Sequence, residues 1–236
     1  MLNIINLLCL TFGTYSQPNR FTYYNDPRIH NFGNTGLGGK IHAFMAPYAT
    51  KMIDSTRYNN IDLRQYILSN YDNYYYSKYK NHPYTIDMCC GVGMSTHKNH
   101  LGIDTSKEMI NKANILQRRK NRNSSPKNKT QTFYKQANAE DYGTNNEFDT
   151  SIIMFSLHEM PKHAQKKIVL NAKRIAKNEV LIMDISPNYK PSSLMLSGEP
   201  YLINYKRNIE SLLKLQDFKT IELIPNHVSL WHYEKN

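Results

Sequence analysis

The chain has 236 residues, a formal net charge of +11 and 40% hydrophobic residues. This length and apolar content suit one globular domain with one core. No stretch of 18 consecutive apolar residues occurs, which excludes a protein with several membrane spans. The cysteines, Cys9, Cys89 and Cys90, form neither a disulfide framework nor a metal-ligand pattern, so we expect no metal site.

The N-terminal third predicts an accessory region before the main domain. Residues 1–16 resemble the apolar part of a targeting signal without a basic start, or else an N-terminal segment that packs on the domain. We expect a cytoplasmic protein, with secretion or organelle targeting through this segment as the alternative. Residues 17–80 predict an arm followed by a helical cap, because residues 40–54 and 62–69 have helical apolar spacing. Residues 81–236 form the predicted main domain.

A glycine turn is the most informative motif in the chain. A short apolar strand from Thr85 contains Asp87 and breaks at Gly91 and Gly93, which permit positive φ and close approach of a ligand to the backbone. We expect a helix to follow and to direct its unpaired N–H groups at that ligand. A second strand then ends at Asp104. Parallel α/β sheets bind an adenosine ribose with this arrangement.

The segment after Asp104 predicts a helix and a basic loop. Residues 105–108 fit a capping box that starts at Thr105, with Met109 on the buried face of the helix. Residues 118–129 are rich in Lys and Arg, which is typical of a contact with an RNA backbone or of a solvated loop. The Asn, Ser and Pro residues in the second half of this segment favour the loop.

The remaining elements alternate between strands and helices. Strands are expected within residues 148–161 and 180–187, and an amphipathic helix over residues 161–177. Another helix is expected over residues 201–216. Residues 218–224 and 228–233 alternate apolar and polar side chains, as paired antiparallel strands do. This order predicts an α/β fold with a terminal antiparallel hairpin.

Several of these segments together resemble class I S-adenosylmethionine-dependent methyltransferases, of the type that acts on small molecules such as quinone precursors. Residues 87–93 resemble the family motif D-x-G-x-G-x-G, with Cys89 at the first glycine. Residues 136–141 resemble the loop that reads adenine, residues 148–161 the F-x-L-H-H-x-P exit of the fourth strand, and residues 180–187 the fifth strand. The matches run from about residue 84 to the C-terminus.

The resemblance implies a fold, a cofactor and a set of residues. The fold is a doubly wound, Rossmann-like sheet of seven mostly parallel strands with an N-terminal helical cap. The cofactor is S-adenosyl-L-methionine, with Asp104 on both ribose hydroxyls and Asn138 at the adenine edge. The cofactor-binding residues that it implies are Asp87, Cys89, Gly91, Gly93, Asp104, Thr105, Met109, Asn138, Ala139, Glu140 and Phe155.

The expected reaction is methyl transfer to a small-molecule acceptor. The methyl group is already activated, so the protein chiefly aligns and desolvates the reactants. A general base helps when the nucleophile is a hydroxyl or an acidic carbon. We expect His158, at the exit of the fourth strand, to be that base, with Asp184 as a second catalytic candidate.

One departure from the family leaves alternatives open. Only residues 90–100 separate Cys89 from Leu101, whereas a parallel crossover usually needs about a dozen residues or more. The first helix is therefore expected to be barely more than a turn, from Met94 to about Asn99. The alternatives are an RNA methyltransferase that uses residues 118–129, and a binding protein of the same fold with weakened catalysis.

Overall fold

The computed structural model describes residues 22–98, 100–124 and 131–235. The expected targeting segment, residues 1–16, lies outside the described residues, as do residues 17–21 of the arm and residues 125–129 of the basic segment. Within the described ranges, no helix is long and apolar enough to cross a lipid bilayer.

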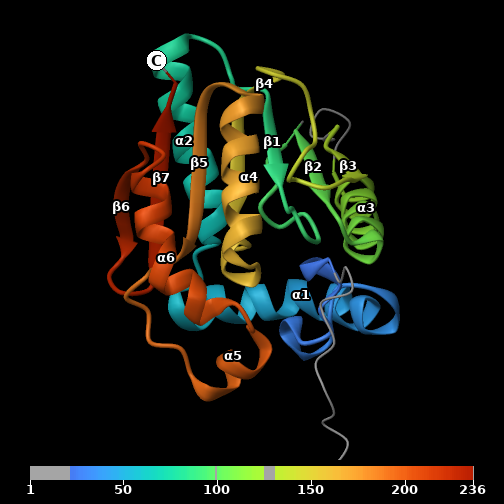
Figure 1. Cartoon of the computed structure of the whole chain (residues 1–236). Coiled ribbons are helices and arrows are strands. Elements are labelled where there is room, and N and C mark those ends of the chain that lie inside the picture. The colour runs from blue at the N-terminus through green and yellow to red at the C-terminus, as the bar shows by residue number, and fades with distance from the viewer. Residues whose placement is uncertain (1–21, 99, 125–130, 236) are drawn as a thin grey trace, which may run out of the picture.

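A seven-stranded sheet with the order β3-β2-β1-β4-β5-β7-β6 forms the centre of the domain (Figure 1). The strands from β3 to β5 in this order are parallel, and β7 is antiparallel to both of its neighbours. The predicted mostly parallel sheet with its terminal hairpin is therefore confirmed. The strands are β1 (Thr85–Met88), β2 (Leu101–Asp104), β3 (Phe133–Gln136), β4 (Phe148–Met154), β5 (Ala176–Ile185), β6 (Lys219–Ile224) and β7 (Val228–Glu234).

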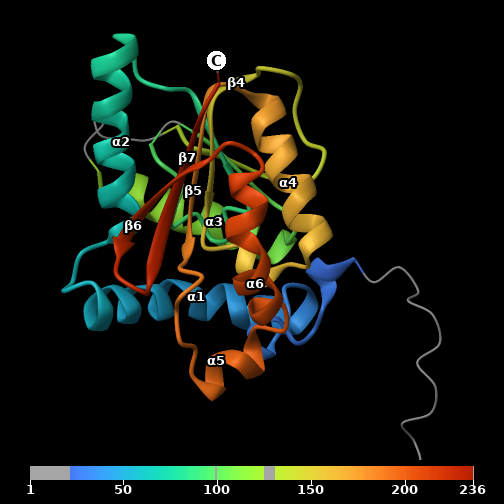
Figure 2. The same cartoon turned by 60° about the vertical axis from the view of Figure 1, so that its left-hand side comes forward.

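Helices cover both faces of the sheet because its central strands are apolar on both sides. Ile153 of β4 packs in the cluster that contains α4 and α6, whereas Ile152 packs in the cluster that contains α2. Figure 2 shows α2 on one side of the sheet and α4 and α6 on the other. The helices are α1 (Gly36–Arg57), α2 (Leu63–Tyr79), α3 (Lys107–Arg122), α4 (Lys162–Ile175), α5 (Ser193–Gly198) and α6 (Leu202–Lys214).

Of the two long N-terminal helices that we expected to form a cap, one lies across the end of the sheet and the other packs on its face. In both views α1 lies across the end of the sheet at which the parallel strands finish (Figure 1, Figure 2). Helix α2 instead packs flat on the sheet, with Leu68, Tyr71 and Tyr75 in a cluster with residues of β4 and β5. Of the described helices α1 and α2, α1 alone therefore lies across the carboxyl edge. The short 3-10 helix η3 (Ile29–Asn31) precedes α1 in the chain.

The start of α3 corrects the predicted capping box. Ser106, not Thr105, is the N-cap, and its hydroxyl accepts a hydrogen bond from the Met109 N–H at 3.2 Å. The Glu108 carboxylate accepts instead from the Gly36 N–H at 3.0 Å. A tertiary contact with the start of α1 has thus replaced the local bond that a capping box would make.

A buried carboxylate fixes α2 to the sheet. Glu179 of β5 accepts hydrogen bonds from the hydroxyls of Tyr71 at 2.9 Å and Tyr79 at 3.1 Å and from the Lys78 ammonium at 3.1 Å. His232 Nε2 of β7 lies 2.8 Å from Glu179 Oε2, the oxygen that Tyr71 also binds. Burial opposes ionisation of Glu179, but these hydrogen bonds outweigh it and lower its pKa. The C-terminal half of α2 is therefore held by a charged network as well as by packing.

This network predicts the effect of one hydroxyl on stability. Tyr71→Phe removes a hydrogen bond to a buried carboxylate, so the free energy of unfolding should fall by about 1.5–3 kcal/mol. Tyr76→Phe is the control, because Tyr76 lies on the same helix but is half exposed, and it should change stability by less than about 0.5 kcal/mol. Urea denaturation measures both. Equal effects of the two substitutions would contradict a stabilising role for the Glu179 network.

Candidate functional site

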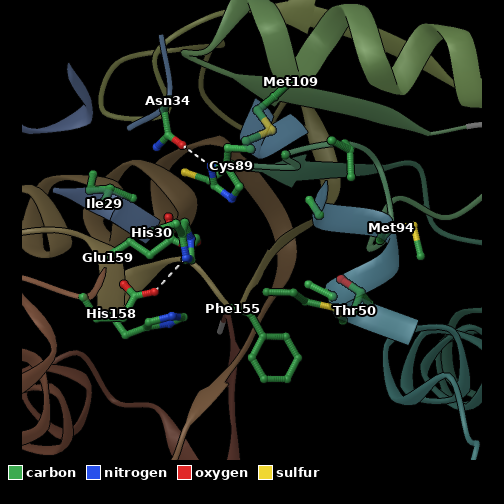
Figure 3. A pocket seen from close by; sticks show the side chains of 18 of the residues that line it. Ile29, His30, Asn34, Thr50, Cys89, Met94, Met109, Phe155, His158 and Glu159 are labelled. Carbon is green, nitrogen blue, oxygen red and sulfur yellow. Dashed lines mark hydrogen bonds and ion pairs between the residues drawn. The ribbon is translucent and has the colours of Figure 1, made fainter. Parts of the chain in front are cut away.

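A pocket of about 860 Å³ opens between the carboxyl edge of the sheet and α1. Its walls come from the ends of β1, β2 and β4, from η3 and α1, and from the connection between β5 and α6. Figure 3 shows His30, His158 and Glu159 on one side of this pocket and Thr50 and Met94 on the other. Of the predicted site residues, those that line it are Cys89, Gly91, Asp104, Thr105, Met109, Asn138, Ala139, Phe155 and His158.

The glycine turn forms without the helix that we expected after it. The described residues of the β1–β2 connection, 89–98 and 100, contain turns but no helix, because the connection is too short for a helical crossover. Cys89 has a φ of 65°, the left-handed conformation that a glycine would adopt without strain. The turn therefore holds Cys89 in a conformation that glycine adopts more readily.

The two glycines of the turn have different surroundings. A Cβ atom added to Gly91, which has a φ of 52°, would meet nothing within 4 Å, and Gly91 lines the pocket. A Cβ atom added to Gly93 would lie 2.4 Å from the Tyr134 hydroxyl oxygen, and Gly93 is not part of the lining. Gly93 is thus required for packing against β3, and Gly91 is the glycine that faces a ligand.

The carboxylate of Asp104, at the end of the neighbouring strand β2, binds the backbone of the glycine turn. It accepts hydrogen bonds from the backbone N–H of Gly91 at 2.9 Å and of Ser106 at 2.8 Å. Burial raises the pKa of Asp104 to about 6, although both hydrogen bonds oppose this shift. Asp104 lines the pocket, as a residue that binds a ribose must.

Asp87 lies behind the turn, where we had expected a contact with the cofactor. Its Oδ2 atom accepts hydrogen bonds from the hydroxyls of Ser95 at 2.9 Å and Thr96 at 2.6 Å, and the residue is not part of the pocket lining. Burial raises its pKa to about 7. In this structure Asp87 therefore shapes the turn instead of facing the pocket.

The loop after β3 supplies part of the pocket wall. Asn138 and Ala139 line the pocket, and the Asn138 side chain accepts a hydrogen bond from the Glu140 N–H at 3.0 Å. Glu140 does not line the pocket, because its carboxylate pairs with Lys167 of α4 at 2.9 Å. Of the three residues of this loop that we expected at the cofactor, Asn138 and Ala139 thus line the pocket and Glu140 does not.

His158 and Asp184 form a buried pair at the end of β4 and β5. His158 Nδ1 lies 2.6 Å from Asp184 Oδ1, and the other Asp184 oxygen accepts from the backbone N–H of Leu157 at 2.8 Å. Burial favours neutral His158, but Asp184 outweighs it and raises the pKa of His158 to about 9. The pair with Asp184 therefore favours the charged form of His158, and its role as a general base stays a prediction. Asp184 does not line the pocket and orients His158 from behind.

The sequence analysis did not identify Arg64 of α2 as a site residue. Its guanidinium lies 4.3 Å above the Phe155 ring and 3.9 Å from Asp54. Its buried Nη1 atom is the one that faces Asp54 Oδ1, but at 3.9 Å it makes no hydrogen bond, and it has no other hydrogen-bond partner among the described residues. A buried cation with an unpaired donor is costly unless a ligand pairs with it. The sequence signal was weak, because one arginine in a polar helix is ordinary.

His30, from the N-terminal region, forms part of the pocket wall. The sequence analysis did not identify it as a site residue. His30 Nε2 lies 3.0 Å from Glu159 Oε1, and His30 Nδ1 lies 2.9 Å from Glu199 Oε1 (Figure 3 shows the first contact). The His42 ring packs against His30 with 4.2 Å between ring centroids. These four residues come from η3, α1, the end of β4 and the end of α5, so no local motif could have brought them together.

A comparison with protein families identifies a domain within the predicted main domain, residues 81–236. Residues 86–184 match a family described as a methyltransferase domain. No curated protein sequence matches the chain.

Solved structures share the fold at low sequence identity. A magnesium protoporphyrin IX methyltransferase from Synechocystis PCC 6803 with bound SAM is 14% identical, with 75% of this chain and 81% of that chain covered and a TM-score of 0.51. The PH0226 protein from Pyrococcus horikoshii OT3 is 16% identical, with coverages of 79% and 95% and a TM-score of 0.52. The plantazolicin methyltransferase BamL, in complex with a triazolic desmethylPZN analog and SAH, is 16% identical, with coverages of 84% and 94% and a TM-score of 0.55.

The surroundings of the two glycines predict different effects of the same substitution. Gly91→Val should lower the affinity for the expected cofactor by roughly tenfold or more, because the branched side chain enters the pocket at a strained φ. Gly93→Val should instead lower the melting temperature, because its side chain collides with Tyr134. Calorimetric titration with S-adenosylhomocysteine and a thermal melt of each variant make the comparison. If Gly91→Val binds like the parent, the turn is not the cofactor site.

Proposed function

We propose that this chain, whose residues 86–184 form a methyltransferase domain with S-adenosylmethionine as its cofactor, methylates a small molecule in the pocket beneath α1. The observation that carries this proposal is the continuity of the pocket. One cavity extends from Asp104 and Asn138 to Glu199 and Tyr189. Its volume of about 860 Å³ is near the upper end of the range for ligand sites, which leaves room for an acceptor beside the cofactor.

The residues at one end of the pocket fit the cofactor. When bound, S-adenosylmethionine supplies an activated methyl group on a positively charged sulfur. The Asp104 carboxylate would hold the ribose hydroxyls, and the open space beside Gly91 lets the ligand reach the backbone. The unpaired Nη1 atom of Arg64 would bind the carboxylate of the methionine part.

The residues at the other end suit a small acceptor. Met45, Met52 and Ile53 of α1 and Tyr189 contribute apolar side chains, and the His30 cluster contributes polar ones. Such a lining, mostly apolar with a few placed polar groups, is typical of small-molecule sites. His158 is proposed to act here as a cation that stabilises negative charge on the acceptor, with Asp184 as its positioning residue.

The two alternatives have less support. Arg118, Arg119, Lys120 and Arg122 belong to the last turns of α3, and none of them lines the pocket. RNA binding would therefore have to reach the methyl-transfer site from elsewhere on the surface. A gel-shift assay with RNA at several salt concentrations tests this alternative, since phosphate contacts weaken steeply with salt.

One pair of experiments tests the proposal. Titration with S-adenosylmethionine and S-adenosylhomocysteine should show binding, and the protein should transfer a radiolabelled methyl group to a component of a metabolite extract. Binding without transfer to any extract would support the non-catalytic alternative. Absence of binding to either ligand would contradict the cofactor assignment.

Asp104 gives a prediction with a defined pH dependence. Asp104→Asn removes the charge from two hydrogen bonds to the ribose, each worth about 1.5–3 kcal/mol, so the affinity should fall by roughly tenfold or more. Because the pKa of Asp104 is raised to about 6, the parent should lose affinity as the pH falls through 6. The affinity of the variant should not fall as the pH passes through 6. This difference distinguishes the titration of Asp104 from that of Asp87, whose pKa is about 7. Asp141→Asn, at an exposed position, is the control, and calorimetry gives the affinities.

Arg64 gives a prediction about which part of the cofactor it binds. Arg64→Gln should weaken S-adenosylhomocysteine by roughly tenfold or more, because it removes a charge-assisted pair with the carboxylate. The same variant should bind 5′-methylthioadenosine, which lacks the amino-acid part, as the parent does. Arg207→Gln on the exposed side of α6 is the control. Equal losses for both ligands would place Arg64 outside the carboxylate subsite.

A further inference from the structure

His30 binds two carboxylates at once, which fixes its protonation state. Its Nε2 atom contacts Glu159 Oε1 at 3.0 Å and its Nδ1 atom contacts Glu199 Oε1 at 2.9 Å. Each ring nitrogen must donate to its carboxylate, and only the imidazolium has two N–H donors. Burial favours the neutral ring, but the two carboxylates outweigh it and raise the pKa of His30 well above its ordinary value. His30 therefore has no lone pair with which to accept a proton.

The other two histidines near this wall are no better placed as proton acceptors at neutral pH. His158 is held as a cation by Asp184, at 2.6 Å from its Nδ1 atom. His42 is neutral, because burial and the neighbouring His30 lower its pKa to about 4. His42 Nδ1 is already hydrogen-bonded to Asn34 Oδ1 at 2.8 Å. The carboxylates of this wall are the remaining candidates for the proton acceptor.

Glu199 has the free atom that the histidines lack. It is 6% exposed and lines the pocket, and its Oε2 atom is buried without a hydrogen-bond partner among the described residues. An unpaired buried carboxylate oxygen costs free energy that a donor from a ligand would recover. Glu159 differs, because its side chain is 22% exposed and neither of its oxygens is buried without a hydrogen-bond partner. Glu199 therefore has an unpaired acceptor atom in the wall at this end of the pocket.

We propose that Glu199 binds the methyl acceptor through an O–H or N–H group and takes up its proton during transfer. This inference rests on the proposed methyltransferase function and deepens it by naming the acceptor class. The acceptor is an alcohol, a phenol or an amine, because these groups present the donor that Glu199 Oε2 lacks. A carboxylate acceptor is disfavoured, because Glu159 and Glu199 would repel it and it has no hydrogen to donate.

The transfer balances with Glu199 in this role. The O–H or N–H bond of the acceptor and the bond between sulfur and the methyl carbon break. A bond forms between the acceptor atom and the methyl carbon, and another between the released proton and Glu199 Oε2. The electron pair of the broken sulfur–carbon bond stays on sulfur, which loses its positive charge as Glu199 loses its negative charge.

Four probes of one shape test the binding half of the proposal without knowledge of the natural acceptor. Benzyl alcohol carries a donor that benzyl methyl ether lacks, and this uncharged pair isolates the hydrogen bond. Benzylamine also carries a donor that benzoate lacks, but benzylamine is a cation at neutral pH and benzoate an anion, so the comparison of these two also contains the effect of charge. Saturation-transfer NMR with the parent protein, with and without S-adenosylhomocysteine, gives their dissociation constants. The two donors should bind about fivefold more tightly than the other two probes, as one recovered hydrogen bond predicts. Equal affinities for all four would overturn the proposal without any variant having to fold.

Glu199→Gln should abolish the advantage of the two donors. The amide oxygen of the new side chain would keep the bond to His30, so its NH₂ group would occupy the place of Oε2. That NH₂ group donates to benzoate, to the ether oxygen and to the hydroxyl oxygen of benzyl alcohol, so benzyl alcohol should no longer bind more tightly than the ether. Glu210→Gln, at an exposed position on α6, should keep the parent order. An unchanged order in Glu199→Gln, with parent affinity for S-adenosylhomocysteine, would contradict the proposal.

The rate of methyl transfer distinguishes failure of the Glu199 proposal from failure of the proposed methyltransferase function. With the metabolite fraction that the parent methylates, Glu199→Gln should lose roughly 10²–10⁴-fold in rate while its affinity for S-adenosylmethionine stays unchanged. A loss of less than about threefold would remove Glu199 as the proton acceptor and leave the methyltransferase function standing. If the parent binds neither S-adenosylmethionine nor S-adenosylhomocysteine, the proposed function fails, whereas the probe series still decides whether Glu199 selects a donor.

Discussion

The short connection between β1 and β2 is the constraint on which the rest of the site depends. The described part of this turn contains no helix, and side chains from β1, β2 and α2 hold it by hydrogen bonds. Asp87 binds the hydroxyls of Ser95 and Thr96 from below, and Asp104 binds the Gly91 N–H from the next strand at 2.9 Å. Gln65 of α2 donates to the Met94 carbonyl oxygen at 3.0 Å. Asp87 thus supports a backbone conformation that a helix would otherwise stabilise.

Helix α2 links this turn to the buried network around Glu179. Its first turn carries Arg64 and Gln65, which reach the pocket and the turn, and its last turns carry the residues that bind Glu179. A helix of 17 residues is about 25 Å long and rigid over that length. The charged contacts at one end therefore help to set the position of Arg64 at the other. This explains why a helix that we expected to cover the pocket packs on the sheet instead.

The fold and part of the cofactor end could be predicted from the sequence because their signals are local. The strand before Asp87, the glycines after it and Asp104 lie within 20 residues of one another, and periodicity identified the helices and the terminal hairpin. Two local features differ from the prediction. The expected first helix is missing from the described residues because the connection is too short for it, and the expected capping box is missing because Glu108 binds the Gly36 N–H instead. His30 and Glu199 are separated by 169 positions, and only the folded chain shows that they touch.

The charges of the acceptor wall complement the chemistry of a sulfonium donor. His30 and His158 are cations there, and Glu159, Glu199 and Asp184 are their carboxylate partners, which leaves one negative charge in excess. A buried unpaired charge is costly, and a positively charged cofactor in the same pocket offsets it. Methyl transfer removes the positive charge of the cofactor, so the wall would keep an unpaired charge unless it gained a proton. Uptake of the acceptor's proton by Glu199, as proposed above, would keep the summed charge of these five side chains and the cofactor at zero before and after the reaction.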